Sequence, residues 1–149
     1  MELIDAIKAA KRVYLIGNGG SAANAQHVAN DLILCGIKAQ ALLDVPTITA
    51  LANDFGYDEI FSRQLEIVGE PGELLIALSG SGRSVNILNA LDVAVRIGMV
   101  TYAVVGAFGD CTAANYARYC IRSGENMQDA EDDQLALFHS FYRILKGFQ

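Results

Sequence analysis

The sequence predicts an α/β protein with a doubly wound, flavodoxin-like sheet of five parallel strands and helices on both faces. Short apolar runs alternate with segments of helical length, and the 149 residues are 52% hydrophobic and 19% charged. Strands that are apolar throughout are typical of a sheet buried on two faces, and strand–helix alternation favours parallel strands with right-handed crossovers. This length and composition suit one compact domain over residues 1–149.

The expected elements follow from the apolar runs and the segments between them. Strands are expected at 12–17, 39–43, 73–79, 99–106 and 118–122. Helices are expected at about 20–35, 57–68, 84–98, 109–117 and 130–147. In such a fold ligands bind at the carboxyl ends of the strands, and two glycine-rich turns fall there.

Charge and cysteine usage narrow the class of protein. A formal net charge of −6 with eleven scattered basic residues argues against a nucleic-acid surface. The three cysteines form no C-x-x-C pair, which favours reduced thiols in a cytoplasmic protein. The N-terminal stretch MELIDAIKAAKR is amphipathic, without an apolar segment for secretion or membrane spanning, so a soluble protein without a membrane partner is expected.

The first glycine-rich turn lies in VYLIGNGGSAANAQH, residues 13–27, between a strand and a helix. A helix N-terminus offers free N–H groups and a partial positive charge to an anion. Gly17, Gly19 and Ala22 also fit the pattern G-x-G-x-x-G/A, so the turn suits either a sugar phosphate or the pyrophosphate of NAD. Asp44, near the end of the next strand, would serve as the ribose-binding acid in the second case.

A second turn, LSGSGRS at 78–84, follows the third strand and also opens a helix. Ser79, Ser81 and Ser84 would supply hydroxyls, while Gly80 and Gly82 let the backbone curl around an anion. Serine and glycine also simply cap helices. Two such turns at the ends of two strands favour anion binding over capping alone.

Both histidines lie on expected helices. His27 and Asp31 are four residues apart and share a helix face, as in a metal site, an acid/base pair or a solvated surface pair. His139 flanks an apolar stripe of the last helix, where a histidine at the edge of the core is the simpler interpretation. The acids of DAEDDQ, 129–134, precede it in or near the first turn, where the helix dipole favours them.

Three blocks of the sequence resemble the sugar isomerase (SIS) domain family and, within it, the phosphoheptose isomerases. They are GNGGSAANAQH (17–27), TALANDFGYDEIFSRQ (49–64) and LSGSGRSVNIL (78–88), in the family's order. The resemblance favours a phosphosugar over NAD and implies no nucleotide cofactor. It further implies that substrate is bound by Asn18, Gly19, Gly20, Ser21, Asn53, Asp54, Ser79, Gly80, Ser81 and Ser84.

The resemblance also implies a zinc site. The family's His-x-x-x-Glu is similar to His27 and Asp31 here, and the glutamine eight residues before the family's second histidine falls on Glu131, with His139 as that histidine. The implied zinc ligands are His27, Asp31, Glu131 and His139. Asp31 would be the base and His139 the acid. Eight helical residues rise about 12 Å, so Asp132 or Gln134 is an alternative partner if Glu131 does not reach the ion.

The implied activity is aldose–ketose isomerisation of sedoheptulose 7-phosphate to glycero-manno-heptose 7-phosphate through an enediol. Asp31 stands where the family has glutamate, and Glu131 where it has glutamine. These two differences leave a second interpretation open, a non-catalytic SIS module that binds a sugar phosphate or a replication initiator protein. Family members carry an additional helical segment for subunit packing, whereas about ten residues precede the first strand here. A homo-oligomer, dimer or tetramer, is still expected, with the two turns and the two histidines around one shared cavity.

Overall fold

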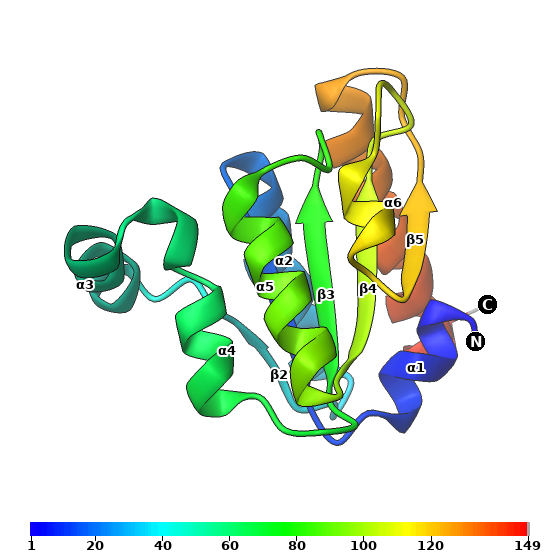
Figure 1. Cartoon of the computed structure of the whole chain (residues 1–149). Coiled ribbons are helices and arrows are strands. Elements are labelled where there is room, and N and C mark those ends of the chain that lie inside the picture. The colour runs from blue at the N-terminus through cyan, green and yellow to red at the C-terminus, as the bar shows by residue number, and fades with distance from the viewer. Residues whose placement is uncertain (149) are drawn as a thin grey trace.

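Five parallel strands form one sheet at the centre of the computed structural model, which describes residues 1–148 (Figure 1). They are β1 (Val13–Gly17), β2 (Ala39–Ala41), β3 (Leu74–Ser79), β4 (Val100–Val105) and β5 (Tyr119–Arg122). The order is β2-β1-β3-β4-β5, which is the flavodoxin-like arrangement. The predicted fold class is confirmed. The strand order reverses between β1 and β3, so the turns after these two strands flank the crevice where ligands bind.

Helices cover both faces of the sheet (Figure 1). One face packs against α1 (Leu3–Ala9), α2 (Gly20–Leu34) and α6 (Met127–Lys146), and the other against α4 (Ser62–Val68) and α5 (Val85–Ile97). Neighbouring strand residues point to opposite faces: Leu15 and Ile76 belong to the core beneath α2, whereas Tyr14 and Leu75 belong to the core beneath α5. Both cores are continuous along the strands, which accounts for their unbroken apolar sequence.

The structure differs from the expected elements at α1, which was not among the expected helices, at α3 (Val45–Phe55), and at residues 57–68 and 109–117. The helix α3 was not predicted, although Asp44 caps it by accepting a hydrogen bond from the Thr47 backbone N–H at 3.2 Å. Asp44 is therefore engaged as a helix cap, not free as the ribose-binding acid considered above. The helix expected at 109–117 is only a short 3₁₀ turn, η2 (Thr112–Asn115).

The expected helix at 57–68 is divided into a 3₁₀ turn, η1 (Tyr57–Glu59), and α4. Gly56, with φ of 95°, separates α3 from η1, because few residues other than glycine adopt this backbone conformation. Among residues 1–148, no helix is both long enough and apolar enough to cross a bilayer.

Candidate active site

The turns after β1 and β3 enclose a small pocket, which we call the loop pocket. It has a volume of about 90 Å³ and is lined by Asn18, Ser21, Ser79, Gly80, Ser81, Ser84, Met127 and Glu131. Six of these eight were predicted to bind substrate. The structure thus brings the two glycine-rich turns together, and α6 contributes the last two residues.

The local sequence explains the shape of this pocket. Ser79 Oγ accepts a hydrogen bond from the Gly82 N–H at 3.1 Å, and Ser81 Oγ accepts one from the Arg83 N–H at 3.3 Å, so serine side chains curl the second turn. Gly82 has φ of 64°, which favours glycine. The turns lead directly into α2 and α5, whose N-termini present free N–H groups and suit an anionic ligand.

Two residues that the sequence analysis did not single out contact the pocket residue Asn18. Asn86, in the first turn of α5, forms two hydrogen bonds with the Asn18 amide, each 2.9 Å long. The Tyr57 hydroxyl donates to Asn18 Oδ1 at 2.8 Å. Both residues lie inside the matched sequence blocks, but only their packing against Asn18 indicates a role.

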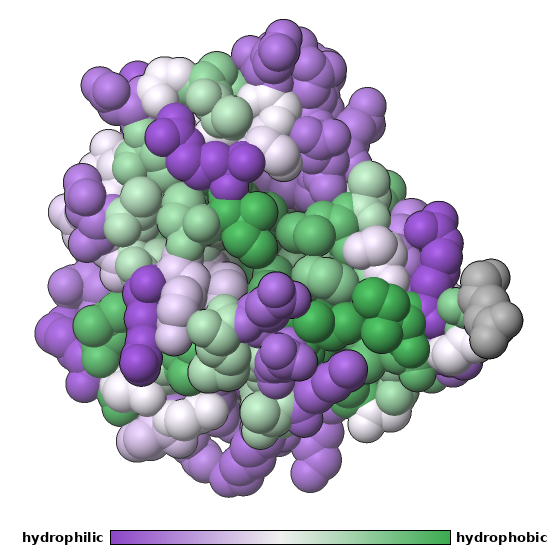
Figure 2. Space-filling model, turned by 90° about the vertical axis from the view of Figure 1, so that its right-hand side faces the viewer, coloured by the Kyte–Doolittle hydropathy of each residue, from purple (hydrophilic) through white to green (hydrophobic). Residues whose placement is uncertain are grey.

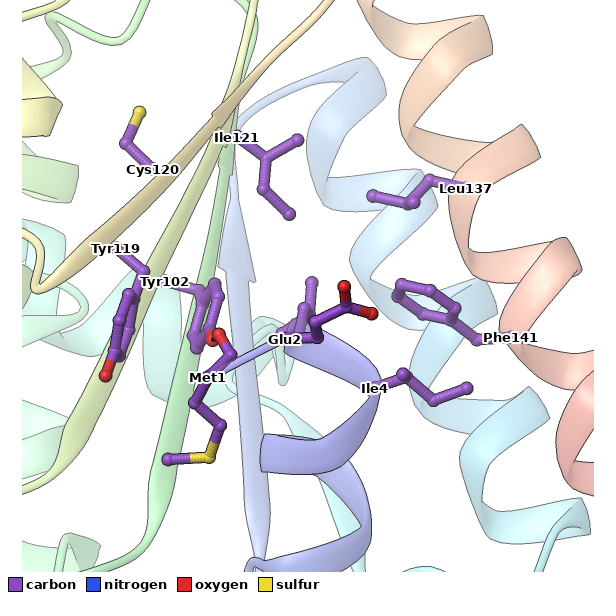
Figure 3. Close-up of a pocket in the computed structure, with 10 residues that line it drawn as sticks. Met1, Glu2, Ile4, Tyr102, Tyr119, Cys120, Ile121, Leu137 and Phe141 are labelled. Carbon is purple, nitrogen blue, oxygen red and sulfur yellow. Dashed lines mark hydrogen bonds between the residues drawn. The ribbon is translucent and has the colours of Figure 1, made fainter.

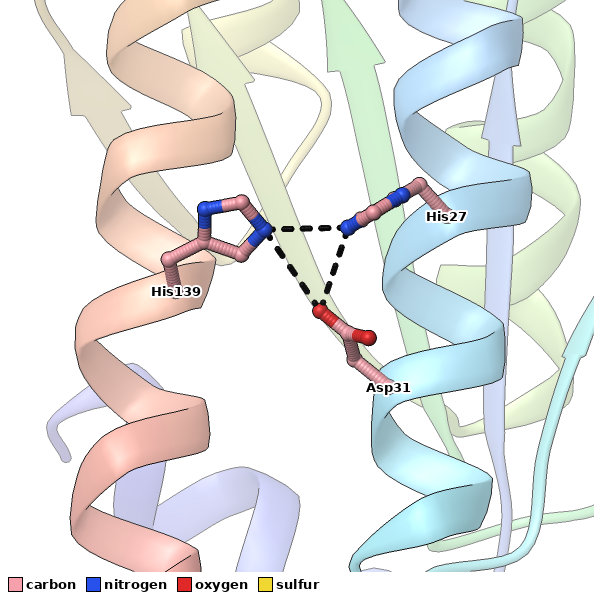
Figure 4. Close-up of side chains that lie close together, drawn as sticks. All are labelled: His27, Asp31 and His139. Carbon is pink, nitrogen blue, oxygen red and sulfur yellow. Dashed lines mark hydrogen bonds and ion pairs between the residues drawn. The ribbon is translucent and has the colours of Figure 1, made fainter. Parts of the chain in front are cut away.

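The two histidines and Asp31 form a compact cluster between α2 and α6, which we call the histidine cluster (Figure 4). The Nε2 atoms of His27 and His139 are 2.9 Å apart. Asp31 Oδ2 lies 3.3 Å from His27 Nε2 and 3.7 Å from His139 Nε2. Asp31 is the most buried of the three, since its side chain is 15% exposed against 49% and 38% for His27 and His139.

The donor set of the histidine cluster fits zinc. Three potential ligand atoms lie within 4.8 Å of one another, and their separations of 2.9, 3.3 and 3.7 Å are similar to the roughly 3.4 Å between ligands of a tetrahedral zinc ion. Two imidazoles and one carboxylate with a fourth position open are a common catalytic zinc set. The cluster can therefore hold a divalent metal ion.

The loop pocket and the histidine cluster are two hollows that share no lining residue. The second has a volume of about 380 Å³, and Tyr142, Arg143 and Phe148 line it beside the cluster. The expectation of one shared cavity therefore differs from the structure, in which polar side chains of α2 and α6 separate the two. Buried Gln134 accepts hydrogen bonds from Ser21 at 3.4 Å and Asn24 at 3.2 Å in this region.

Glu131 lies apart from the histidine cluster. It is eight residues before His139 on α6, a rise of about 12 Å, and it lines the loop pocket with its carboxylate against Gly20. Of the alternative partners, Gln134 has its side-chain oxygen engaged by α2, and Asp132 is exposed. The structure therefore assembles three of the four predicted metal ligands.

The other predicted substrate residues have different surroundings. Asn53 and Asp54 lie on the protruding helix α3, where the Asn53 amide donates to the Asp54 carboxylate at 3.0 Å, and neither lines the loop pocket (Figure 1). Gly19, with φ of 55°, is the N-cap of α2. Gly20 cannot carry a side chain without displacing the Glu131 carboxylate.

Two cysteines lie behind the second turn. Cys111 Sγ would be 3.1 Å from a Cβ atom added at Gly82, and it lies 3.8 Å from Cys120 Sγ. Burial, followed by the proximity of Cys111, raises the pKa of Cys120 to about 11. Thiols with a raised pKa stay protonated at neutral pH, in agreement with structural rather than reactive cysteines.

Residues 2–106 match the SIS domain family model. The chain belongs to the SIS domain family. Among its relatives, the phosphoheptose isomerase of Akkermansia muciniphila is 44% identical over 124 residues, covering 78% of this chain and 65% of the relative. The phosphoheptose isomerase of Trichlorobacter lovleyi is 35% identical over 144 residues, covering 92% of this chain and 74% of the relative. The chain spans between 54% and 65% of the length of the first three curated relatives that it matches.

Solved structures of SIS domain proteins agree with this family. Phosphoheptose isomerase GmhA from Neisseria gonorrhoeae superposes with a TM-score of 0.88 at 27% identity, covering 97% of this chain and 81% of that one. A phosphoheptose isomerase from Francisella tularensis superposes with a TM-score of 0.87 at 28% identity, covering 97% and 82%.

Proposed function

We propose that this SIS domain chain is an aldose–ketose isomerase that converts sedoheptulose 7-phosphate to glycero-manno-heptose 7-phosphate. The observation that carries the proposal is the placement of the loop pocket and the histidine cluster along one helix, α2, with α6 completing both. Relatives described as phosphoheptose isomerases support the choice of substrate.

The loop pocket anchors the phosphate. Hydroxyls of Ser79, Ser81 and Ser84 and the N-terminus of α5 supply hydrogen-bond donors around it. His27 is six residues along α2 from Ser21, a rise of about 9 Å. A sugar with several carbons beyond its phosphate is long enough for such a distance, and we propose that it lies across the polar side chains of α2 and α6 that separate the two hollows, so that fixing the phosphate orients the reacting carbons toward the histidine cluster.

Asp31 and His139 carry the proton transfers. Asp31 Oδ2 faces both imidazoles while its second oxygen is turned away from them, free to remove the proton from the carbon beside the carbonyl (Figure 4). His139 then moves a proton between the two sugar oxygens at its Nδ1, which points away from His27 and Asp31 (Figure 4), while its Nε2 faces the cluster, and an enediol forms between these steps. Return of the proton to the neighbouring carbon completes the isomerisation.

His27, Asp31 and His139 would hold a zinc ion. When bound, the ion supplies Lewis-acid polarisation of the sugar carbonyl and stabilises negative charge on its oxygen. Glu131 is left out of this ligand set because its carboxylate lies in the loop pocket.

The molecule also presents two surfaces that suit association with further copies. The helix α3 has no buried residue, and its apolar Val45 and Phe55 are 70% and 50% exposed. A separate apolar region lies over α1, β5 and α6 on the face seen in Figure 2, around a hollow of about 390 Å³. Tyr102 and Tyr119 from the sheet, Ile4 from α1 and Phe141 from α6 line that hollow (Figure 3).

We propose that second copies of the chain cover these surfaces in a dimer or tetramer. Light scattering coupled to size-exclusion chromatography should report a mass above that of one chain. Val45→Asp on α3 and Ile4→Asp at the hollow should each lower that mass, whereas exposed Ile67→Asp should not. A single-chain mass for the unaltered protein would refute association.

Turnover and metal content test the isomerase. The purified protein should bind about one zinc ion per chain and form an aldose from sedoheptulose 7-phosphate. His139→Asn should lower kcat by about 10²- to 10⁴-fold, the usual contribution of an acid/base group, while sugar-phosphate binding persists. Ser140→Ala is the matched control, since the Ser140 hydroxyl bonds only within α6.

The outcomes separate the two functions considered from the sequence. Unchanged turnover in His139→Asn would remove His139 from the mechanism. Sugar-phosphate binding by the unaltered protein without any isomerisation would instead favour a non-catalytic SIS module.

A further inference from the structure

Asn18, in the wall of the loop pocket, is held by two residues that do not line that pocket. Asn86 is 2% exposed and forms a reciprocal amide pair with Asn18, with both hydrogen bonds 2.9 Å long. Tyr57, from η1, donates its hydroxyl to Asn18 Oδ1 at 2.8 Å. Three separate segments, the turn after β1, η1 and the start of α5, therefore meet at one side chain.

These bonds determine what Asn18 can offer to a ligand. A carboxamide oxygen accepts up to two hydrogen bonds, and its nitrogen donates two. Asn18 Oδ1 is already occupied by Asn86 and Tyr57, and one Nδ2 hydrogen is used by Asn86 Oδ1. One Nδ2 hydrogen is left, so the Asn18 side chain can act toward the pocket only as a donor.

We propose that Asn86 and Tyr57 are positioning residues that fix Asn18 as a hydrogen-bond donor to an oxygen of the bound sugar phosphate. This rests on the proposed function, in which the loop pocket binds that ligand. A reversed Asn18 amide would direct its oxygen at the electron-rich oxygens of the substrate. Asn86 opposes the reversal, because Asn18 Nδ2 would then face the Asn86 Nδ2 donor and Asn18 Oδ1 would face the Asn86 Oδ1 acceptor.

The burial of Asn86 supports this role. Burying an amide costs free energy unless its polar atoms form hydrogen bonds. Both the oxygen and the nitrogen of the Asn86 amide bond to Asn18, which lines the loop pocket. A purely structural role would be seen in stability alone. A positioning role should be seen in ligand affinity, at unchanged stability in the case of exposed Tyr57.

Tyr57→Phe and Asn86→Leu test the proposal. Tyr57→Phe removes one hydroxyl from a side chain that is 57% exposed, so it should fold as the unaltered protein does. The dissociation constant for sedoheptulose 7-phosphate should rise about three- to tenfold in Tyr57→Phe and more in Asn86→Leu. KM should follow it, while kcat changes less than twofold. Because both act through one amide, the double variant should show less than the product of the two effects.

Asn89→Ala is the matched control. Asn89 is on the same helix and donates to the Asp58 carbonyl of the same 3₁₀ turn at 3.1 Å, without contacting Asn18. It should leave the dissociation constant unchanged. Calorimetric titration on the His139→Asn background gives the constants without turnover, and thermal unfolding of each variant confirms its fold.

Unchanged sugar-phosphate affinity in folded Tyr57→Phe and Asn86→Leu would overturn the inference. An equal loss of affinity in Asn89→Ala would also overturn it, because the effect would then be one of general destabilisation. Failure of the proposed function is a different result: no isomerisation by the unaltered protein, with weakened sugar-phosphate binding in both variants, would refute the isomerase and retain the positioning role.

Discussion

The carboxylate of Glu131 lies against Gly20, so closely that a Cβ atom at position 20 would overlap it. Gly20 begins α2, and the N-terminus of a helix favours negative charge. The same N-terminus borders the loop pocket, so Glu131 brings a negative charge to the place where an anionic ligand would bind.

Glu131→Gln should therefore tighten phosphate binding. Removal of one partly solvated charge near the ligand is expected to lower the dissociation constant for inorganic phosphate by about three- to tenfold. Calorimetric titration measures it, with exposed Asp132→Asn on the same helix as the control. Equal or weaker binding in Glu131→Gln would show that its carboxylate does not face the ligand.

Asp31→Glu should weaken zinc binding. Asp31 Oδ2 already lies within 3.3 and 3.7 Å of the two imidazole nitrogens, so a side chain one methylene longer must bend back to reach the same position. We expect roughly tenfold lower affinity, about 1.4 kcal/mol, in competition with a chromophoric chelator. Tighter binding in Asp31→Glu would mean that the ion lies farther from α2 than the cluster indicates.

Stability should fall as the pH rises from 9 to 11. The pKa of Cys120 is raised from 9.0 to about 11, so over this interval the folded protein keeps a proton that the unfolded chain releases. The stabilisation is complete below pH 9 and is lost as the pH rises through 11. Urea unfolding at several pH values should show a steeper decline for the unaltered protein than for Cys120→Ala. Parallel declines would contradict the raised pKa.

Leu65→Ala should destabilise the protein by about 2–5 kcal/mol, because Leu65 is fully buried between α4 and the sheet. Ile67, two residues further along the same helix, is 84% exposed, and Ile67→Ala should change stability by no more than about 0.5 kcal/mol. Urea denaturation compares the two free energies of unfolding. Similar effects would show that α4 does not pack as described.

The central strands β1, β3 and β4 were predictable because they are almost entirely apolar, as in a sheet covered on both faces, whereas the edge strands β2 and β5 are half-exposed and include Gln40 and Arg122. The helix α3 was not predicted, because its apolar face is only partly buried: Ile48, Leu51 and Ala52 pack against the core without being enclosed by it. The local sequence nevertheless indicates where α3 begins, because Asp44 caps the helix and Pro46 lies in its first turn. The helix expected at 109–117 was wrong, because only Thr112–Asn115 is helical there, as a single 3₁₀ turn.

The candidate site was predictable where chemistry follows from local sequence. Serine and glycine at strand ends predicted the loop pocket, and the spacing of His27 and Asp31 predicted two of the three residues of the histidine cluster. His27 and His139 are 112 residues apart in the sequence and meet through packing of α2 against α6, which only the resemblance to SIS domains indicated in advance. The direction of Glu131, and the bonds of Tyr57 and Asn86 to Asn18, depend on side-chain orientation that a single sequence does not encode locally.

The contribution of α6 to both hollows has a consequence for synthesis. All five strands and both glycine-rich turns precede His139 in the order of synthesis. Competence for proton transfer would then arise in one late step, when the last helix docks. The same helix covers one face of the sheet with buried Phe138, so a chain terminated before α6 would lack the second imidazole and would also leave apolar surface of the sheet uncovered.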